Sequence, residues 1–153
     1  MNALELKVPP PLVLLLLAGL MWLIARQAPP PDLPFALRLS VALGLACIGE
    51  GIGIAGILAF RRARTTVNPL RPANTVALVD TGVFRLTRNP MYLGMLLTLT
   101  GWGVYLARPW PLLCLPIFVA YIYRFQIVPE ERVLREKFGA AYLAYTARVR
   151  RWV

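Results

Sequence analysis

A basic loop meets an apolar segment within residues 82–94, where Arg85 and Arg88 come just before Asn89 and Pro90. Asparagine is favourable at a helix N-cap, and proline suits the first helical position because its missing N–H would be unpaired there anyway. A helix is therefore predicted to begin at Pro90, with its free N–H groups and positive dipole end beside the arginines, where an anion can bind. The alternative is that the arginines only set membrane topology and Asn-Pro only begins a helix.

A second polar cluster follows the last apolar run, where Arg124 is followed by Pro129, Glu130 and Glu131. Acidic side chains suit the first turn of a helix, so the two glutamates alone do not require a site. In the topology argued below, however, this cluster lies on the same membrane face as Arg88. The loop and the tail are therefore predicted to converge on one polar ligand.

Two further groups of charges have competing interpretations. Glu131 with Arg135, and Arg132 with Glu136, are spaced for i, i+4 ion pairs on a solvated helix surface. Glu50 lies in the middle of an apolar run, where a carboxylate costs several kcal/mol unless it is neutral, paired or in a wet cavity. Glu50 is either protonated and hydrogen-bonded to a neighbouring helix or part of a substrate pocket.

The composition excludes several kinds of site. The chain has no histidine, which removes zinc-protease motifs, histidine-centred triads and the usual general base. Cys47 and Cys114 stand alone in apolar runs, so neither a disulfide framework nor a metal site is predicted. The net charge of +10 comes from basic residues between and after apolar runs, which is typical of membrane topology rather than nucleic-acid binding.

The elements that must position these residues are membrane helices. With 153 residues, 58% hydrophobic content and a mean hydropathy of +0.61, the chain is long and apolar enough for about four spans of ~20 residues. The predicted fold is an all-α integral membrane protein with about four transmembrane helices and a cytoplasmic amphipathic C-terminal helix. It forms one domain, made of a two-helix anchor at 1–60, a cytoplasmic loop at 61–89, a helical hairpin at 90–128 and the C-terminal helix at 129–153.

Small residues and prolines predict how these elements pack. Glycines at helix-packing spacing are Gly49 with Gly53 on the second span, and Gly94, Gly101 and Gly103 on the third. Pro116 is predicted to kink the fourth span and to leave a gap for a lipophilic molecule, and Gly139 to bend the C-terminal helix. The segment 75–82 is too apolar for a free linker and is predicted to fold back against the helix ends.

The basic residues predict the orientation in the membrane. Fourteen of the 17 lysines and arginines fall near the N-terminus, in the loop or in the tail, and only Arg26, Arg38 and Arg108 fall on the opposite side. The positive-inside rule therefore predicts that both termini and the loop are cytoplasmic.

The two polar clusters, with the hydrophobic hairpin between them, resemble a known family. The first reads Leu78-Val79-x-x-Gly82-x-Phe84-x-x-x-Arg88-Asn89-Pro90-x-Tyr92-x-Gly94, and the second reads Pro129-Glu130-Glu131-x-x-Leu134-x-x-x-Phe138-Gly139-x-x-Tyr142-x-x-Tyr145-x-x-Arg148-Val149. Over roughly the second half of the chain this pattern is similar to the isoprenylcysteine carboxyl methyltransferase and phospholipid methyltransferase family. The resemblance implies an integral membrane enzyme that uses S-adenosylmethionine, bound at the cytoplasmic helix ends, to methylate a lipophilic acceptor.

The resemblance also implies roles for individual residues. Those implied to bind the cofactor are Leu78, Val79, Gly82, Arg88, Asn89, Pro90, Tyr92, Gly94, Glu130 and Glu131. Arg124 is implied to lie near the reacting groups and, with Glu50, is the candidate for a catalytic role. Many carboxyl methyltransferases of the family have histidine where this chain has Asn89, and the asparagine form implies a bacterial inner-membrane relative. The acceptor therefore stays open among a carboxylate, an isoprenoid and a lipid head group.

Methyl transfer asks the protein mainly to hold a nucleophile in line with the sulfonium methyl, shielded from water. A carboxylate acceptor needs no base, whereas an amine or alcohol would need Glu50, Glu130 or Glu131 as proton acceptor. Two other hypotheses stay open. One is an NADPH-dependent membrane reductase of the sterol or steroid type, which carries a related Arg-Asn-Pro-x-Tyr pattern. The other is a non-catalytic membrane subunit that assembles through its glycine faces, and the oligomeric state is open.

Overall fold

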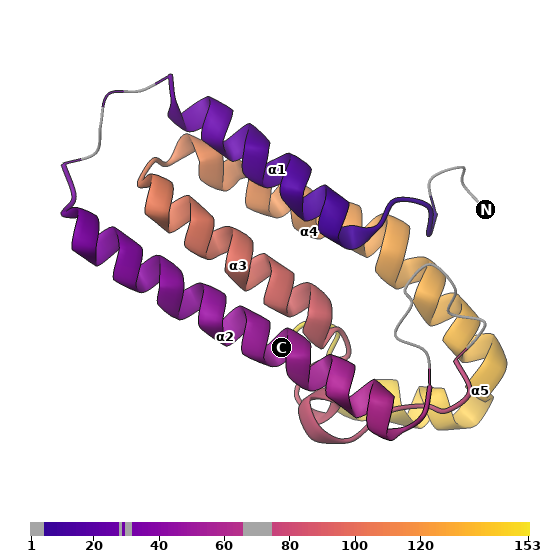
Figure 1. Ribbon diagram of the computed structural model, residues 1–153. Coiled ribbons are helices and arrows are strands. Elements are labelled where there is room, and N and C mark those ends of the chain that lie inside the picture. Colours follow the sequence, from indigo (N-terminus) through magenta and orange to yellow (C-terminus); the bar gives the residue numbers. More distant parts are fainter. Residues whose placement is uncertain (1–4, 28, 30–31, 66–74) are drawn as a thin grey trace.

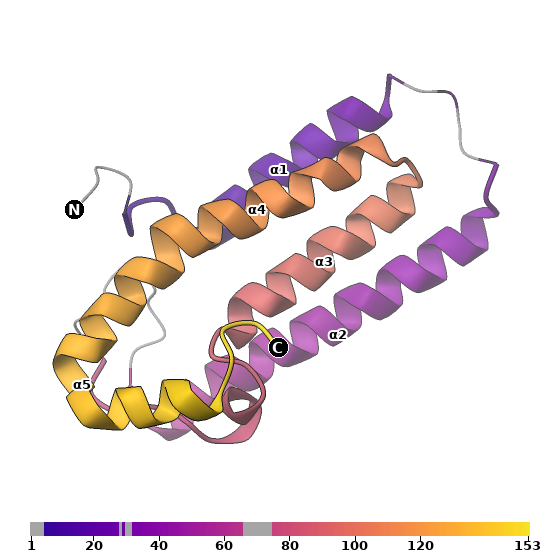
Figure 2. The same ribbon diagram turned by 180° about the vertical axis from the view of Figure 1, so that it is seen from behind.

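The computed structural model describes residues 5–27, 29, 32–65 and 75–153, and every regular element in these ranges is helical. Residues 1–4 of the predicted anchor and 66–74 of the predicted loop lie outside the described residues. Four helices run side by side, and a fifth continues from the fourth and turns back beneath the ends of the second and third (Figures 1 and 2). They are α1 (Pro10–Ala25), α2 (Phe35–Arg62), α3 (Pro90–Leu106), α4 (Cys114–Ile122) and α5 (Val128–Arg148).

Helices α2 and α3 approach until their backbones touch. The buried residues of α2 are Ala42, Gly49 and Gly56, spaced seven apart along one face. A Cβ built on Gly49 would lie 2.5 Å from the carbonyl oxygen of Gly94, so no larger residue fits there without a shift. The prediction that Gly49 and Gly94 are helix-packing positions is therefore confirmed, and the structure shows that they pack against each other. At Gly53, the predicted GxxxG partner of Gly49, a Cβ would meet open space instead.

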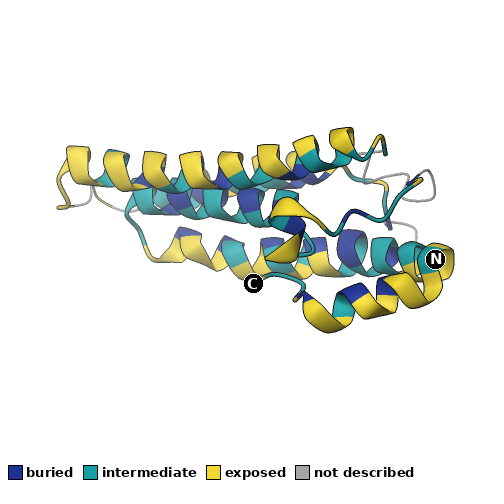
Figure 3. Ribbon diagram, turned by 90° about the horizontal axis from the view of Figure 1, so that it is seen from below, coloured by how far each residue is buried: buried dark blue, intermediate teal, exposed yellow. Residues whose placement is uncertain are grey.

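The other side of α3 packs against α1 and α4 through a conventional apolar core. Met21 and Phe118 are fully buried, and Leu99 of α3 is 1% exposed. The indole N–H of Trp102 donates to the carbonyl of Ala18 at 3.0 Å, which joins α3 to α1. Burial coloured on the ribbon shows buried residues turned towards the inside of the bundle and exposed ones along its outer faces (Figure 3).

A π-helical turn, Tyr123–Ile127, joins α4 to α5 without a break. Its cause lies in the sequence, because Pro129 has no N–H to donate to the carbonyl of Phe125 four residues earlier. That carbonyl instead accepts a hydrogen bond of 3.1 Å from the backbone N–H of Leu6, in the segment before α1. The helix widens at this point, and such π turns are frequent at functional sites.

The predicted kink at Pro116 is wrong, and the predicted bend at Gly139 is confirmed. Pro116 lies in the first turn of α4, after the 3₁₀ turn Trp110–Leu113, where a proline disturbs the helix least. Gly139 has φ 48° and ψ −120°, a backbone conformation that side-chain-bearing residues avoid. The chain bends there, and the last part of α5 returns towards the start of α3 (Figure 2).

Within the described residues, two helices are long and apolar enough to cross a membrane. They are α2, with 28 residues, and the continuous helix from Trp110 to Arg148, with 39 residues. Helix α1 is apolar but has only 16 residues. The number of four transmembrane helices and the membrane-surface position of the C-terminal helix therefore stay predictions.

Candidate functional site

A pocket opens where the segment before α3, the first turn of α3 and the first half of α5 meet. Its empty space, including the part open to solvent, is about 800 Å³. Its walls are mostly apolar and aromatic, with a few charged groups. The lining residues are Phe60, Thr75, Ala77, Leu78, Val79, Phe84, Arg88, Asn89, Pro90, Met91, Tyr92, Glu130, Glu131, Leu134, Tyr142 and Tyr145.

The two polar clusters identified in the sequence meet in this pocket. Eight of the ten residues implied to bind a cofactor line it, namely Leu78, Val79, Arg88, Asn89, Pro90, Tyr92, Glu130 and Glu131. The segment before α3 reaches the pocket because it folds back as predicted, with Thr75 and Val79 buried. Further lining residues come from α5, which lies at the ends of α2 and α3 (Figure 1).

The remaining two, Gly82 and Gly94, lie outside the pocket lining. Gly82 has φ 59° and begins the 3₁₀ turn Gly82–Arg85, which places Phe84 in the wall. Gly94 lies one turn further along α3 than the lining residue Pro90 and packs against Gly49. Both glycines therefore shape the backbone around the site instead of lining it.

The two candidate catalytic residues also lie away from the pocket lining. The Arg124 guanidinium is 2.8 Å from the Glu5 carboxylate, in the segment before α1, and the same carboxylate is 3.5 Å from Arg132. Glu50 accepts a hydrogen bond of 3.2 Å from the Thr98 hydroxyl on α3. The contact of Glu50 fits the hypothesis of a glutamate bonded to a neighbouring helix rather than a pocket residue.

Glu130 is the acidic group that the pocket holds in its apolar part. The Tyr92 hydroxyl donates to its carboxylate at 2.6 Å, linking the start of α5 to the start of α3. Glu130 lies beyond residue 128, where the predicted apolar hairpin ends. Burial raises its pKa to about 8, with the Tyr92 hydrogen bond opposing the rise and the Glu131 charge adding to it. This carboxyl group is therefore poised to lose its proton when a cation binds beside it.

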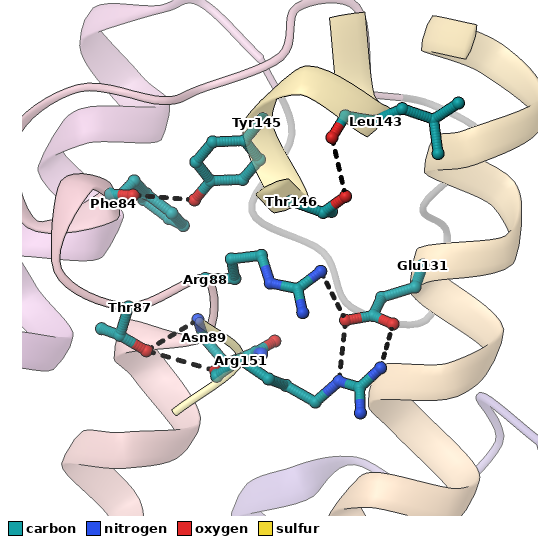
Figure 4. A network of polar contacts seen from close by, with 9 residues as sticks. All are labelled: Phe84, Thr87, Arg88, Asn89, Glu131, Leu143, Tyr145, Thr146 and Arg151. Atoms are coloured by element: carbon teal, nitrogen blue, oxygen red, sulfur yellow. Dashed lines mark hydrogen bonds and ion pairs between the residues drawn. The ribbon is translucent and has the colours of Figure 1, made fainter. Parts of the chain in front are cut away.

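Glu131, the next residue, lies between two arginines (Figure 4). Its carboxylate is 3.2 Å from the Arg88 guanidinium and accepts two hydrogen bonds from Arg151, at 2.9 and 2.7 Å. The predicted pairing of Glu131 with Arg135 is thus replaced by contacts across the fold. Similarly, Arg132 faces Glu5 instead of Glu136. The Glu131 carboxylate is thus paired with two arginines, whereas Glu130 accepts a hydrogen bond from a tyrosine. The two neighbouring glutamates therefore lie in different electrostatic surroundings.

Asn89 occupies the N-cap position of α3, and Pro90 is the first helical residue as predicted, but the predicted side-chain cap is wrong. The Asn89 amide instead donates to the carbonyl of Arg151 at 2.8 Å, and the Thr87 hydroxyl donates to the same carbonyl at 3.3 Å. The first turn of α3 therefore faces the pocket without a side-chain cap, beside Arg88.

Tyrosines from the last part of α5 close the aromatic wall. The Tyr145 hydroxyl donates to the carbonyl of Phe84 at 2.8 Å, and Phe84 packs edge-on against Phe60 of α2 with ring centres 5.1 Å apart. Burial raises the pKa of Tyr142 to about 12 and that of Tyr145 above its usual value, so both hydroxyls stay neutral donors at neutral pH. The wall is held by hydrogen bonds as well as by packing.

Several of these residues had no role predicted from the sequence, namely Phe60, Thr75, Phe84, Tyr142, Tyr145 and Arg151. The aromatic residues Phe84, Tyr142 and Tyr145 belong to the family pattern, so that pattern was a signal for them. Arg151 had no local signal, because its partners Glu131 and Asn89 are 20 and 62 residues away in the chain.

The site therefore offers one acidic and one basic subsite between apolar walls. The carboxyl group of Glu130 suits a cation. Arg88 and the uncapped start of α3 suit a carboxylate or another anion. Such a pair fits a ligand that carries both charges, with an apolar or aromatic part against Leu78, Val79 and Phe84.

Apolar helices with a charged pocket where they end define the class, an all-helical protein with helices able to cross a membrane and a pocket at one end of its bundle. The model of the phospholipid methyltransferase family matches residues 37–141, and the chain belongs to this family. Family and apolar helices together make it an integral membrane protein.

The chain is similar to plant enzymes and to a shorter bacterial protein. It is 29% identical over 107 residues to protein-S-isoprenylcysteine O-methyltransferase B of Arabidopsis thaliana, covering 70% of this chain and 54% of the relative. It is 32% identical over 102 residues to protein-S-isoprenylcysteine O-methyltransferase A of the same plant, covering 67% of this chain and 52% of the relative. An uncharacterized protein of Haemophilus influenzae is 43% identical over 63 residues, 41% of this chain and 100% of its own. The chain spans about half the length of the plant relatives, and no solved structure matches it.

Proposed function

We propose that this protein is a methyltransferase that uses S-adenosylmethionine and acts on a lipophilic acceptor resident in the membrane. The observation that carries the proposal is the pocket in which the acidic side chain of Glu130 and the basic side chain of Arg88 lie between apolar walls. The family membership and the similarity to the Arabidopsis enzymes support the reaction class.

The residues of the pocket fit this cofactor. S-adenosylmethionine carries an ammonium, a carboxylate, a sulfonium and an adenosine, and the pocket offers a partner for each kind of group. Glu130 would hold a positive group, Arg88 with the start of α3 would hold the carboxylate, and the wall at Leu78, Val79 and Phe84 would take the adenine. When bound, the cofactor supplies an electrophilic methyl group.

The protein's own contribution is orientation and exclusion of water. Tyr92 fixes the Glu130 carboxyl group through its 2.6 Å hydrogen bond, and the apolar walls lower the water content around it. A carboxylate acceptor attacks without a base. For an amine or hydroxyl acceptor, Glu130, with a pKa of about 8 in the free protein, is a pocket acid able to take up a proton near neutral pH.

The proposal includes a membrane arrangement. Four transmembrane helices, both termini and the pocket on the cytoplasmic side, and a bacterial inner membrane are proposed from the distribution of the basic residues and the family pattern. Arg124 and Glu50, first considered as catalytic, are not part of the proposed machinery because they lie outside the pocket lining.

The test is to titrate the purified protein in detergent with S-adenosylmethionine and with NADPH, and then to supply bacterial lipid extracts with methyl-labelled S-adenosylmethionine. Binding of S-adenosylmethionine and transfer of label to a lipid-extractable product are expected. Tight binding of NADPH alone would replace the proposal by a reductase. Binding of neither ligand would leave the protein without an enzymatic cofactor and would overturn the proposal.

A further inference from the structure

The C-terminal tail runs directly over the start of α3. The backbone N–H of Arg88 donates to the carbonyl of Arg150 at 3.1 Å. The next carbonyl, that of Arg151, accepts from the Asn89 amide at 2.8 Å and from the Thr87 hydroxyl at 3.3 Å. Three consecutive residues before α3 are therefore fastened to two consecutive residues of the tail.

The Arg151 side chain continues this fastening to α5 and to the π turn. Its guanidinium makes two hydrogen bonds to the Glu131 carboxylate (Figure 4). The same guanidinium lies over the Tyr123 ring, 4.9 Å from the ring centre. Planar pairing through two hydrogen bonds fixes both distance and orientation. One residue thus joins the loop before α3, the start of α5 and the π turn.

This arrangement decides where Arg88 lies. Arg88 and Arg151 share one carboxylate, so the Arg88 guanidinium is placed by Glu131, and Glu131 is in turn placed by Arg151. Arg151 itself is absent from the pocket lining, whereas Arg88, Asn89 and Glu131 belong to it. Arg151 also lies beyond residues 37–141, the part that the family model matches.

We propose that Arg151 is a positioning residue, which sets the geometry of the pocket by holding Glu131, and through it Arg88, and by holding Asn89. The inference deepens the proposed function, on which its ligand-binding test rests. Lysine cannot replace arginine fully here, because an ammonium group is a point charge without the planar fork that spans both carboxylate oxygens.

The chain offers a matched control beside it. Arg150 is exposed and contacts the loop only through its backbone carbonyl among the contacts described, and alanine retains that carbonyl. Arg151→Ala and Arg150→Ala remove the same charge from neighbouring positions. In titrations with S-adenosylmethionine we expect Arg151→Ala to weaken binding roughly tenfold to a hundredfold, Arg151→Lys to lose less, and Arg150→Ala to stay within about twofold of the wild type.

A double variant tests whether Arg151 acts through Glu131 or whether its loss disturbs the structure in general. If Arg151 acts through Glu131, the double variant Arg151→Ala with Glu131→Gln weakens binding by much less than the product of the two single effects. Independent effects that multiply would contradict this route. If Arg151→Ala does not fold, the same comparison with Arg151→Lys decides the question, since the lysine keeps the charge.

Amide hydrogen exchange tests, without any ligand, whether Arg151 holds the tail against the segment before α3. The backbone amides of Arg88 and Asn89 should exchange faster in Arg151→Ala than in Arg150→Ala. Equal exchange in the two variants would overturn the inference. A wild-type protein that binds no S-adenosylmethionine would sink the proposed function, and the exchange result would still decide whether Arg151 orders the loop. Equal affinities of the two variants for S-adenosylmethionine would refute the positioning role while leaving the proposed function intact.

Discussion

Two carboxylates of this protein each lie between two arginines, and each fastens a segment near one end of the described chain. Glu131 pairs with Arg88 and Arg151, which ties the C-terminal tail to the start of α3. Glu5 pairs with Arg124 and Arg132, which ties the segment before α1 to the helix that leaves the π turn. The ion-pair chemistry is the same in the two clusters.

The surroundings differ, and they separate a role in binding from a role in folding. Glu131 and Arg88 line the pocket, and the Arg88 side chain is only 14% exposed. Arg124 and Arg132 are 43% and 48% exposed and lie outside the lining. The first cluster should therefore control ligand affinity, and the second should control the attachment of the N-terminal segment.

The largest expected difference comes from removing one arginine from each cluster. Arg88→Ala should weaken binding of S-adenosylmethionine by up to about a hundredfold, because a hydrogen bond to a charged group is worth about 1.5–3 kcal/mol. Arg132→Ala should leave the affinity within about twofold. Titration calorimetry measures both, and similar losses in the two variants would end the distinction between the clusters.

The opposite pattern is expected for stability when the N-terminal cluster is broken. Glu5 is 3% exposed, so Glu5→Gln removes a buried charge from two arginines and should destabilise the protein by about 1–2 kcal/mol, reduced from the value for fully buried pairs by the exposure of both arginines. Thermal unfolding in detergent is the measurement. Glu136→Gln, at an exposed position, is the control. An unchanged unfolding midpoint for Glu5→Gln would show that the ion pairs of Glu5 contribute nothing to stability.

Glu130, the neighbour of Glu131, is expected to make the binding of S-adenosylmethionine depend on pH. The pKa of Glu130 in the free protein is raised to about 8, so below pH 8 it is mostly protonated, and a bound cation favours the carboxylate. Affinity for S-adenosylmethionine should therefore rise about tenfold between pH 6 and pH 7 and level off near pH 8, with proton release on binding. Calorimetry in buffers of different ionisation enthalpy detects the proton. Glu130→Gln should abolish this slope, and a slope that survives the substitution belongs to another group.

The smallest effect concerns the bend that brings the tail to Glu131. Gly139 has φ 48° and open space around it, so Gly139→Ala is penalised by backbone strain alone, about 1 kcal/mol. Gly51→Ala, in α2 with open space and ordinary helical geometry, should instead be neutral or slightly stabilising. Unfolding midpoints of the two variants that shift equally would mean that the bend stores no strain.

Features with a local cause were predictable from the sequence. The start of α3 at Pro90, the bend at Gly139 and the return of residues 75–82 all follow from backbone preferences or from apolar residues that need cover. The meeting of Arg88 with Glu130 and Glu131 in one pocket was also predictable, because the predicted topology put both clusters at one membrane face.

Features decided by distant partners were not predictable. Asn89 prefers to cap its own helix, but the Arg151 carbonyl offers its amide an acceptor at 2.8 Å. Glu131 and Arg135 are well spaced for a pair, yet two arginines brought by the fold replace it. Pro129 is a local signal for the π turn, whereas Pro116, where a kink was predicted, lies where the helix has only begun.

The most direct test of the central claim is the affinity for S-adenosylmethionine of Glu130→Gln compared with Glu136→Gln, by titration calorimetry at pH 8. Glutamine reproduces the neutral form of Glu130 and can still accept the Tyr92 hydrogen bond, so the fold should be retained while the negative charge is lost. The account predicts a loss of affinity of roughly a hundredfold for Glu130→Gln and no change for Glu136→Gln, which removes a charge from the exposed side of the same helix. Equal affinities for the two variants would contradict it.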